Sequence, residues 1–174
     1  RRCGGAVARA SDAGSNIVYR PGQPSDELLM AATMVKEKMN PLGIDHKRFL
    51  VAASDSEIVG FGQIRALDDG SLWELASLWV QPEARGQGIG GALVRRLLRA
   101  HNEDSGRPLD SLFLLTLEPT TSFYEALSFR VATKDEVPKA MALEVAAGTA
   151  LSFVLGNKLV CMRHTGQAPD EVRL

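Results

Sequence analysis

The sequence is poor in cysteine, has almost no net charge and contains no long apolar segment. Its two cysteines, Cys3 and Cys161, are too few and too far apart for a disulfide framework, which favours a reducing compartment. The histidines at 46, 101 and 164 follow no metal-ligand spacing, so we expect no metal. A net charge of -1 gives no broad attraction to nucleic acid or acidic lipid. No apolar run approaches the roughly 18 residues of a membrane span. We therefore expect neither a nucleic-acid nor a membrane partner.

The remaining composition is that of an ordinary soluble globular domain. The chain has 174 residues, 45% of them hydrophobic and 24% charged, which suffices for one domain with a proper core. We place that domain at residues 16–164, with tails at 1–15 and 165–174. Residues 1–11 are rich in Arg, Ala and Ser and have no acidic residue, a composition typical of organelle transit peptides. The alternative is a disordered tail without function.

Hydrophobic periodicity and turn residues predict alternating strands and helices, an α/β (α+β) chain. The expected strands are residues 16–20, 49–53, 58–66, 72–80, 112–117, 130–133 and 158–163. Strands 49–53, 58–66 and 72–80 form an antiparallel meander. A whole helix separates 72–80 from 112–117, so these two strands are expected to be parallel. Further helical segments are expected from Ser25 to Lys38, over 121–127 and over 138–155.

The first of these helices is expected to begin at Ser25 as its N-cap and to end before the loop at residues 40–44. Its predicted buried face consists of Leu28, Ala32, Val35 and Met39. Two further methionines, at 30 and 34, flank this face and are interpreted as core rather than as a binding surface.

The chain is organised around a glycine-rich loop between a strand and a helix. Four glycines lie within six residues, at positions 86, 88, 90 and 91, and apolar residues at helical spacing follow. Glycine brings bare backbone N–H groups close to a ligand, and the first turn of a helix leaves N–H groups unpaired beside a partial positive charge. The pattern therefore predicts a phosphate-binding site.

Three other interpretations of this loop fit its residues less well. Gly86, Gly88 and Gly91 satisfy G-x-G-x-x-G, but a dinucleotide loop follows its strand directly and usually opens its domain. A P-loop would need Gly-Lys-Ser/Thr where Gly91 is followed by Ala92 and Leu93. A turn without a ligand would leave the four glycines unexplained, because each glycine at a helix start costs about 1 kcal/mol of stability relative to alanine.

Two segments resemble the GNAT superfamily of N-acetyltransferases. Residues 80–90, V-Q-P-E-A-R-G-Q-G-I-G, resemble its acyl-CoA signature Arg/Gln-x-x-Gly-x-Gly/Ala through Arg85, Gly88 and Gly90. Residues 122–129, S-F-Y-E-A-L-S-F, resemble its later F-Y-E-x-L-G-F segment, with Ser128 in place of the usual glycine. The resemblance covers residues 16–164. It implies a GNAT fold: a mixed, mostly antiparallel sheet of six to seven strands, a splayed parallel pair in its middle, and helices on both faces.

The resemblance implies acetyl-CoA as co-substrate, with the thioester between the two splayed strands. The residues expected to bind it are Leu78, Trp79, Val80, Arg85, Gly86, Gln87, Gly88, Ile89, Gly90 and Gly91 on one side and Leu117, Glu118, Pro119 and Tyr124 on the other. Tyr124 is expected to be the acid, because a tyrosine stays protonated at neutral pH and can donate to a departing thiolate. Glu74, a charge within an apolar strand, is the first candidate for the base that accepts the amine proton. Glu118 is the second.

The same resemblance favours a protein acceptor and a plastid location. Residues 39–43, 59–65 and 159–162 look like the GNAT enzymes of plant and algal plastids, which acetylate protein N-termini and lysine side chains. A lysine is neutral in about one molecule in two thousand at pH 7, and an α-amine in about one in seven, so a weak base favours α-amines. A small-amine acetyltransferase and a non-catalytic acyl-CoA sensor remain open, and the sequence does not indicate an oligomeric state.

Overall fold

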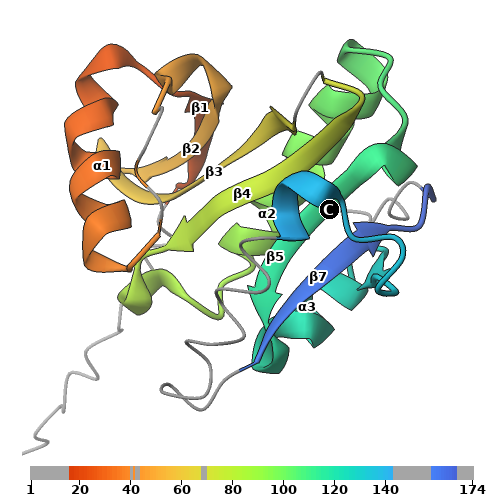
Figure 1. The fold of residues 1–174 in the computed structure, drawn as a ribbon. Helices are drawn as coiled ribbons and strands as arrows, with labels where there is room; N and C mark the ends of the chain where they lie inside the picture. The colour runs from red at the N-terminus through yellow and green to blue at the C-terminus, as the bar shows by residue number, and fades with distance from the viewer. Residues whose placement is uncertain (1–15, 40, 42–43, 68–69, 143–157, 168–174) are drawn as a thin grey trace, which may run out of the picture.

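The computed structural model describes residues 16–39, 41, 44–67, 70–142 and 158–167, which form one mixed sheet with helices on both faces. The strands are β1 (Val18–Pro21), β2 (Phe49–Ser54), β3 (Glu57–Leu67), β4 (Leu72–Val80), β5 (Leu112–Leu117), β6 (Phe129–Val131) and β7 (Leu159–His164). They lie in the order β1-β2-β3-β4-β5-β7-β6 (Figure 1). The pair β4–β5 is parallel, and every other neighbouring pair is antiparallel. The predicted fold class is confirmed.

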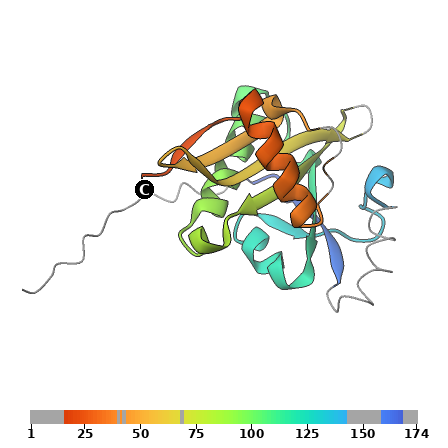
Figure 2. The same cartoon turned by 90° about the vertical axis from the view of Figure 1, so that its left-hand side faces the viewer.

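The α-helices that lie wholly within the described residues are α1 (Glu27–Lys36), α2 (Ile89–Arg99) and α3 (Thr121–Glu125). The alternation of side chains along β2 shows which face of the sheet α1 and α2 cover. Val51 packs in a cluster with Met30 and Met34 of α1, whereas its neighbour Ala52 packs in another cluster with Leu93 of α2. Because successive strand residues point to opposite faces, α1 and α2 cover opposite faces of the sheet, as Figure 2 shows.

The predicted buried face of α1 was wrong at Leu28, Ala32 and Val35, which are exposed, whereas Met39, beyond the end of α1, packs against the cluster of Met30 and Met34 as predicted. Leu28 is 82% exposed and Val35 is 63% exposed, whereas Met30 and Met34 are completely buried. The two methionines are four residues apart, so they lie on one face of the helix and contact the core together. Ser25 also is not the α1 cap: it lies in a 3₁₀ turn over Pro24–Asp26, and α1 starts two residues later. The interpretation of both methionines as core is confirmed.

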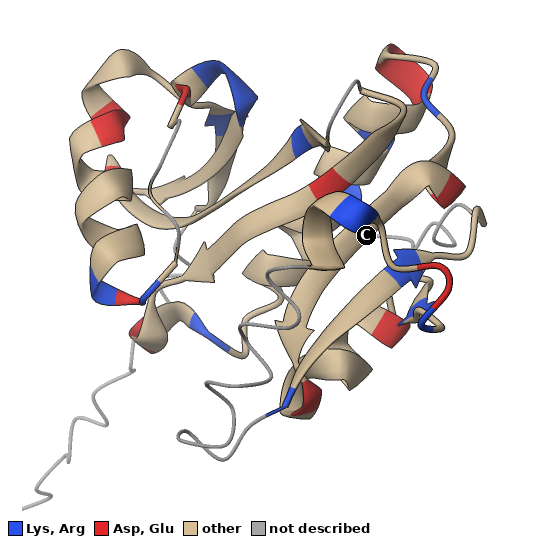
Figure 3. Cartoon of the chain, viewed as in Figure 1, with Lys and Arg blue, Asp and Glu red and all other residues tan. Residues whose placement is uncertain are grey.

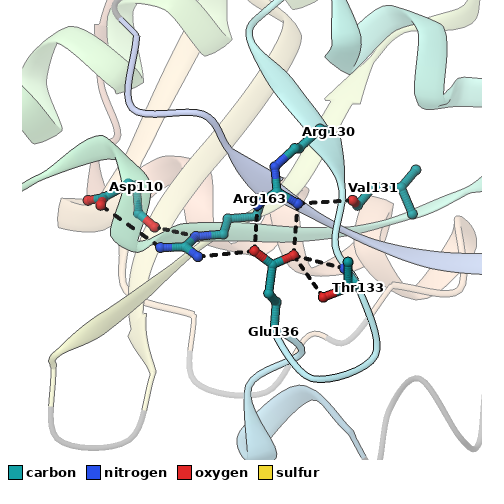
Figure 4. A network of polar contacts seen from close by, with 6 residues as sticks. All are labelled: Asp110, Arg130, Val131, Thr133, Glu136 and Arg163. Carbon is teal, nitrogen blue, oxygen red and sulfur yellow. Dashed lines mark hydrogen bonds and ion pairs between the residues drawn. The ribbon is translucent and has the colours of Figure 1, made fainter.

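The segment after β6 is fastened to β7 by charged side chains (Figure 4). Glu136 accepts hydrogen bonds from the guanidinium groups of Arg130 and Arg163 and from the backbone N–H of Thr133. The Nε of Arg163 in turn donates to the carbonyl of Asp110, just before β5, over 2.8 Å. These hydrogen bonds, first of all that from Arg130, hold the pKa of Glu136 well below its usual range. The network ties the β6 end of the sheet to its centre.

Charged residues of both signs are spread over the described chain, but the central strands are apolar where they run toward the glycine loop. Figure 3 shows that β4 beyond Glu74 carries no charged residue, and the same is true of all of β5. Within the described residues, no helix is both long and apolar enough to cross a membrane. The predicted helix over 138–155 lies mostly outside the described residues, as do both predicted tails except residues 165–167.

Candidate functional site

The two parallel strands are paired only at their first residues. Ladder pairs join Trp73 to Leu112 and Glu74 to Phe113, and no further pair joins β4 to β5 within the described chain. The register between β3 and β4 shifts near Ser77, whose φ of 55° is left-handed. Such a bulge bends a strand and increases its twist. From residue 75 onward, the β5 side of β4 therefore has no ladder partner among the described residues, which is the splayed pair that the resemblance implied.

The glycine loop begins where β4 ends. The Nε of Arg85 donates to the carbonyl of Val80 over 3.0 Å, which holds the start of the loop against the strand. Gly86 and Gly88 have φ angles of 78° and 79°, and a Cβ at either position would meet no atom within 4 Å. Both glycines are thus required by backbone conformation, and open space lies in front of them.

The first turn of α2 follows directly. The bond from Ala92 N–H to the Gly88 carbonyl is the first of the helix, so the amides of Ile89, Gly90 and Gly91 have no acceptor within the helix. A Cβ at Gly91 would lie 3.3 Å from the guanidinium of Arg95, one turn further on. Arg95 therefore adds positive charge beside these amides. Sequence reasoning missed this arginine, although its spacing of four residues from Gly91 is the signal that could have identified it.

Tyr124 lies on α3, close to the end of β5. Its ring packs edge-on against Phe123 and Phe129, with ring centroids 4.8 and 6.1 Å away. Burial raises the pKa of Tyr124 to about 12, and the nearby Thr116 hydroxyl of β5 has a smaller effect in the opposite direction. Ser128, three residues beyond α3, has a φ of 66°, so a serine occupies the left-handed position expected for glycine.

Glu74 lies on the other face of the sheet from Tyr124. Its neighbours Trp73 and Leu75 pack with the α2 cluster, so the Glu74 side chain points away from α2. It is 5% exposed, and its Oε2 accepts a hydrogen bond of 2.6 Å from the Nε of Arg65, the residue opposite it on β3. The sequence indicated that Glu74 faces a cavity or a partner, and the structure supplies a partner.

The remaining predicted wall residues, Leu117, Glu118 and Pro119, lie exposed at the end of β5. The amide of Glu118 donates to the Lys158 carbonyl over 2.8 Å, which anchors this corner to the segment that leads into β7. The Glu118 side chain is exposed, in contrast to the buried carboxylate of Glu74.

His46 and Cys161 lie outside the predicted site, and their contacts explain both. The side chains of Glu27, Asp45 and His46 form a cluster in which the atoms able to bind a metal lie within 4.8 Å of one another. The Nδ1 and the backbone N–H of His46 both contact Glu27 Oε1, at 2.7 and 3.1 Å, and the Asp45 side chain accepts a hydrogen bond from Lys47 N–H, which caps the turn.

Cys161 is 4% exposed. Burial, with a smaller effect of nearby Glu74, raises the pKa of its thiol to about 11, so Cys161 is a poor nucleophile.

A groove of about 480 Å³ lies at the far end of α2 from the glycine loop. Its lining includes Trp73, Leu97 and His101, and Arg107 lies over the Trp73 ring at 4.0 Å. Since α2 rises about 1.5 Å per residue over its eleven residues, this groove lies a full helix length from the glycine loop. The candidate site is therefore defined by strand divergence and open amides.

Comparison with known proteins assigns the chain to a family. A model of the acetyltransferase (GNAT) domain matches residues 45–131, half of the chain, and this range includes the glycine loop and Tyr124. The chain therefore belongs to the GNAT acetyltransferase family.

Individual relatives match either a short part of the chain or at low sequence identity. Mycothiol acetyltransferase of Rhodococcus opacus (strain B4) is 43% identical over 63 residues, which cover 36% of this chain and 20% of that protein. N-acetylglutamate synthase from Neisseria gonorrhoeae, solved with coenzyme A and N-acetyl-glutamate, matches with a TM-score of 0.61 and 19% identity over 87% of this chain and 35% of that one.

Two solved structures match along nearly their whole length. The Mycobacterium tuberculosis protein Rv2747, solved in complex with CoA, has a TM-score of 0.62 and 25% identity over 84% of this chain and 98% of its own. Escherichia coli ElaA has a TM-score of 0.60 and 18% identity over 85% and 99%. By contrast, this chain spans only a fifth of the mycothiol enzyme and about a third of the N-acetylglutamate synthase.

Proposed function

We propose that this protein is an acetyl-CoA-dependent N-acetyltransferase that transfers acetyl to a primary amine by direct attack in a ternary complex. The observation that carries the proposal is the loss of pairing between β4 and β5 beyond Glu74 and Phe113, next to a helix start with open amides. This arrangement offers a slot for an extended arm and an anion site at one end of it. Membership of the GNAT family supports the assignment.

The anion site suits the diphosphate of coenzyme A. The amides of Ile89, Gly90 and Gly91 point along the N-terminal end of α2, where the helix dipole favours negative charge. Arg85 and Arg95 add positive charge. The pantetheine arm carries amide groups, and the edge of β4 at Leu78, Trp79 and Val80 can pair with them as one strand pairs with another. Leu117, Glu118 and Pro119 supply the opposite wall at the end of β5.

Tyr124 is proposed as the acid. The co-substrate supplies an activated acetyl thioester, whose sulfur leaves as a thiolate with an ordinary pKa near 8.5. With a pKa of about 12, Tyr124 stays a phenol throughout the working range and donates a hydrogen bond to the developing charge. The same burial disfavours a free thiolate beside Tyr124, so a hydrogen bond from the phenol would stabilise the departing sulfur.

Glu74 is proposed as the base, with Glu118 as the alternative. Glu74 and Tyr124 lie on opposite faces of the sheet, which matches a reaction in which the amine approaches from one side and the sulfur leaves on the other. The carboxylate of Glu74 is held by Arg65 at 2.6 Å, so it is oriented before the amine arrives. Glu118, by contrast, is exposed to solvent, and Arg65 is paired with Glu74.

The acceptor is proposed to be a protein N-terminal α-amine or a lysine ε-amine, in a plastid. The support is the sequence resemblance to plastid enzymes and the composition of residues 1–11, which lie outside the described part of the chain. A small-molecule amine is the second candidate, because the relatives named above include a mycothiol acetyltransferase and an N-acetylglutamate synthase. A non-catalytic acyl-CoA sensor is a third, and retention of Tyr124 beside the gap speaks against it.

One experiment separates these candidates. The protein is incubated with acetyl-CoA and a peptide library, and mass spectrometry separates α-amine from ε-amine products. We expect acetylated peptides from the wild type and about 10²- to 10⁴-fold lower turnover from Tyr124→Phe. Release of free coenzyme A only in the presence of a small amine would favour the second candidate. Binding of acetyl-CoA without turnover on any amine would contradict catalysis.

A further inference from the structure

The groove at the far end of α2 from the glycine loop has the features of a second ligand site. Its volume of about 480 Å³ is within the usual range of small-molecule pockets. The apolar part of its lining comes from Ile64 of β3, Trp73 of β4 and Leu97 of α2. None of these residues belongs to the glycine loop or to the unpaired parts of β4 and β5. The proposed acetyl transfer therefore does not account for this groove.

A buried histidine lines the groove and lacks a hydrogen-bond partner. His101, in the turn Ala100–Asp104 that follows α2, is 4% exposed, and neither of its ring nitrogens makes a hydrogen bond within the described residues. Burial, with a smaller effect of Arg107, lowers the pKa of His101, so the ring is neutral at neutral pH and has one N–H donor. Buried polar side chains in native proteins are nearly always hydrogen-bonded. A ligand in the groove would supply the partner that His101 lacks.

Positive charge surrounds the same groove. Among the described residues that line it, none is acidic, and four are lysine or arginine. Arg48 and Arg65 are each paired with a carboxylate, at 3.6 and 2.6 Å. Lys47, in the 3₁₀ turn His46–Arg48, and Arg107 form no ion pair within the described part of the chain. The groove thus has two cations available for an anionic ligand.

One of these cations lies close to the buried histidine. The guanidinium of Arg107 lies over the Trp73 ring, 4.0 Å from its centre, and the His101 ring packs edge-on against the same ring at 5.2 Å. A charged donor and a neutral donor therefore lie beside one indole. A phosphate group has three strong acceptor oxygens, so it can accept from Arg107, from Lys47 and from the His101 N–H together.

We propose that this groove binds a small phosphate monoester with an apolar body, at a site separate from that of the acetyl donor. The phosphate is held by Lys47, Arg107 and His101, and the body packs on the apolar lining. The inference goes beyond the proposed function and does not depend on it, since no residue of the groove takes part in the proposed acetyl transfer except Arg65, which orients Glu74.

The fluorescence of Trp73 can report whether the groove is occupied. The chain has two tryptophans, so Trp79→Phe leaves Trp73 as the only one. This variant is titrated with phenyl phosphate, with and without saturating coenzyme A, which keeps the probe away from the amides at the head of α2. We expect a saturable change in Trp73 fluorescence with a Kd of about 1 mM or below. Benzoate should bind more weakly than phenyl phosphate, and neutral benzyl alcohol more weakly still.

Charge variants made in the same background test the two cations. Lys47→Gln and Arg107→Gln should each weaken phenyl phosphate binding about 10-fold or more, because each removes a hydrogen bond to a charged oxygen. Arg99→Gln is the matched control. It removes the same charge at the same end of α2, but Arg99 does not line the groove. The Kd of Arg99→Gln should stay at the value of the background protein.

The histidine gives a second, opposite readout. His101→Phe keeps a ring of similar size and removes two buried nitrogens that have no partner. It should therefore raise Tm by a few degrees and at the same time weaken phenyl phosphate binding about 10-fold. A histidine with a purely structural role would instead lose stability on substitution and leave the Kd for phenyl phosphate unchanged.

Four results would overturn the proposal. They are a titration with phenyl phosphate that shows no saturable change, loss of the signal when coenzyme A is added, equal weakening in Arg99→Gln and Arg107→Gln, and tighter binding of benzoate than of phenyl phosphate. The first would leave His101 as a buried histidine without a ligand. The second would place the probe at the head of α2 instead of in the groove.

Discussion

Alanine at Gly88 should damage cofactor binding far more than it damages the fold. Gly88 has a φ of 79°, and an added Cβ would meet no atom within 4 Å, so the substitution creates no clash within the protein. The structural cost is only that of holding an alanine in the left-handed region, about 1–2 kcal/mol. For a chain of this length that lowers Tm by about 2–8 °C. The methyl group would project into the space in front of the open amides.

The matched control is Gly106→Ala. Gly106 has a φ of 63° and equally has no atom within 4 Å of an added Cβ, but it lies beyond the other end of α2. The two variants should therefore lose similar stability. Loss of one N–H bond to a charged phosphate oxygen is worth about 1.5–3 kcal/mol. The Kd for coenzyme A should accordingly rise about 10- to 100-fold in Gly88→Ala and stay at the wild-type value in Gly106→Ala.

Isothermal titration with coenzyme A, together with thermal unfolding of all three proteins, makes this comparison. If Gly88→Ala binds coenzyme A as tightly as Gly106→Ala and the wild type, the amides at the start of α2 do not hold the diphosphate. If both variants lose affinity equally, the loss follows stability rather than the site.

Three further predictions concern single side chains. Ser128→Gly relieves a left-handed serine with a φ of 66° and should raise the free energy of unfolding by about 1 kcal/mol in urea denaturation; a lower value would show that the serine side chain stabilises this turn. His164 is 1% exposed, and burial lowers its pKa to about 4, so the unfolded chain binds a proton there that the native chain does not. The free energy of unfolding should therefore have its full value above about pH 6.5 and fall by about 3 kcal/mol as the pH drops to 4. His164→Phe should reduce this loss of stability in acid. An unchanged dependence of the free energy of unfolding on pH would contradict the role given to His164. Glu74→Gln should lower turnover on lysine peptides about 10²-fold or more. Turnover on α-amine peptides should fall by less, because α-amines are more often neutral at pH 7. If the variant and the wild type have equal rates, Glu118 becomes the candidate base.

Much of the sheet could be predicted because its signals are local. Strand β4 is bounded by turn residues and Pro82, and β5 is an uninterrupted apolar run, so both strands have the predicted bounds. The glycine loop was identified from the spacing of its glycines and from the helical pattern that follows them, and the left-handed φ angles of Gly86 and Gly88 explain two of its four glycines.

What the sequence did not show depends on contacts between distant segments. The buried face of α1 could not be read from periodicity, because Leu28 and Met30 are both apolar and only the packing against β2 and β3 selects the methionines. The pairing of Glu74 with Arg65 depends on the register of β3 against β4, which the bulge near Ser77 shifts.

The central claim is that the amides at the head of α2 bind the diphosphate of coenzyme A while its arm lies between β4 and β5. Amide nitrogen–proton correlation spectra recorded during titration with coenzyme A test this claim most directly. We expect the largest shifts at Ile89, Gly90 and Gly91, followed by Leu78 and Val80, and none of these shifts with NAD. Unchanged amides at the head of α2, or the same shifts with NAD, would contradict it.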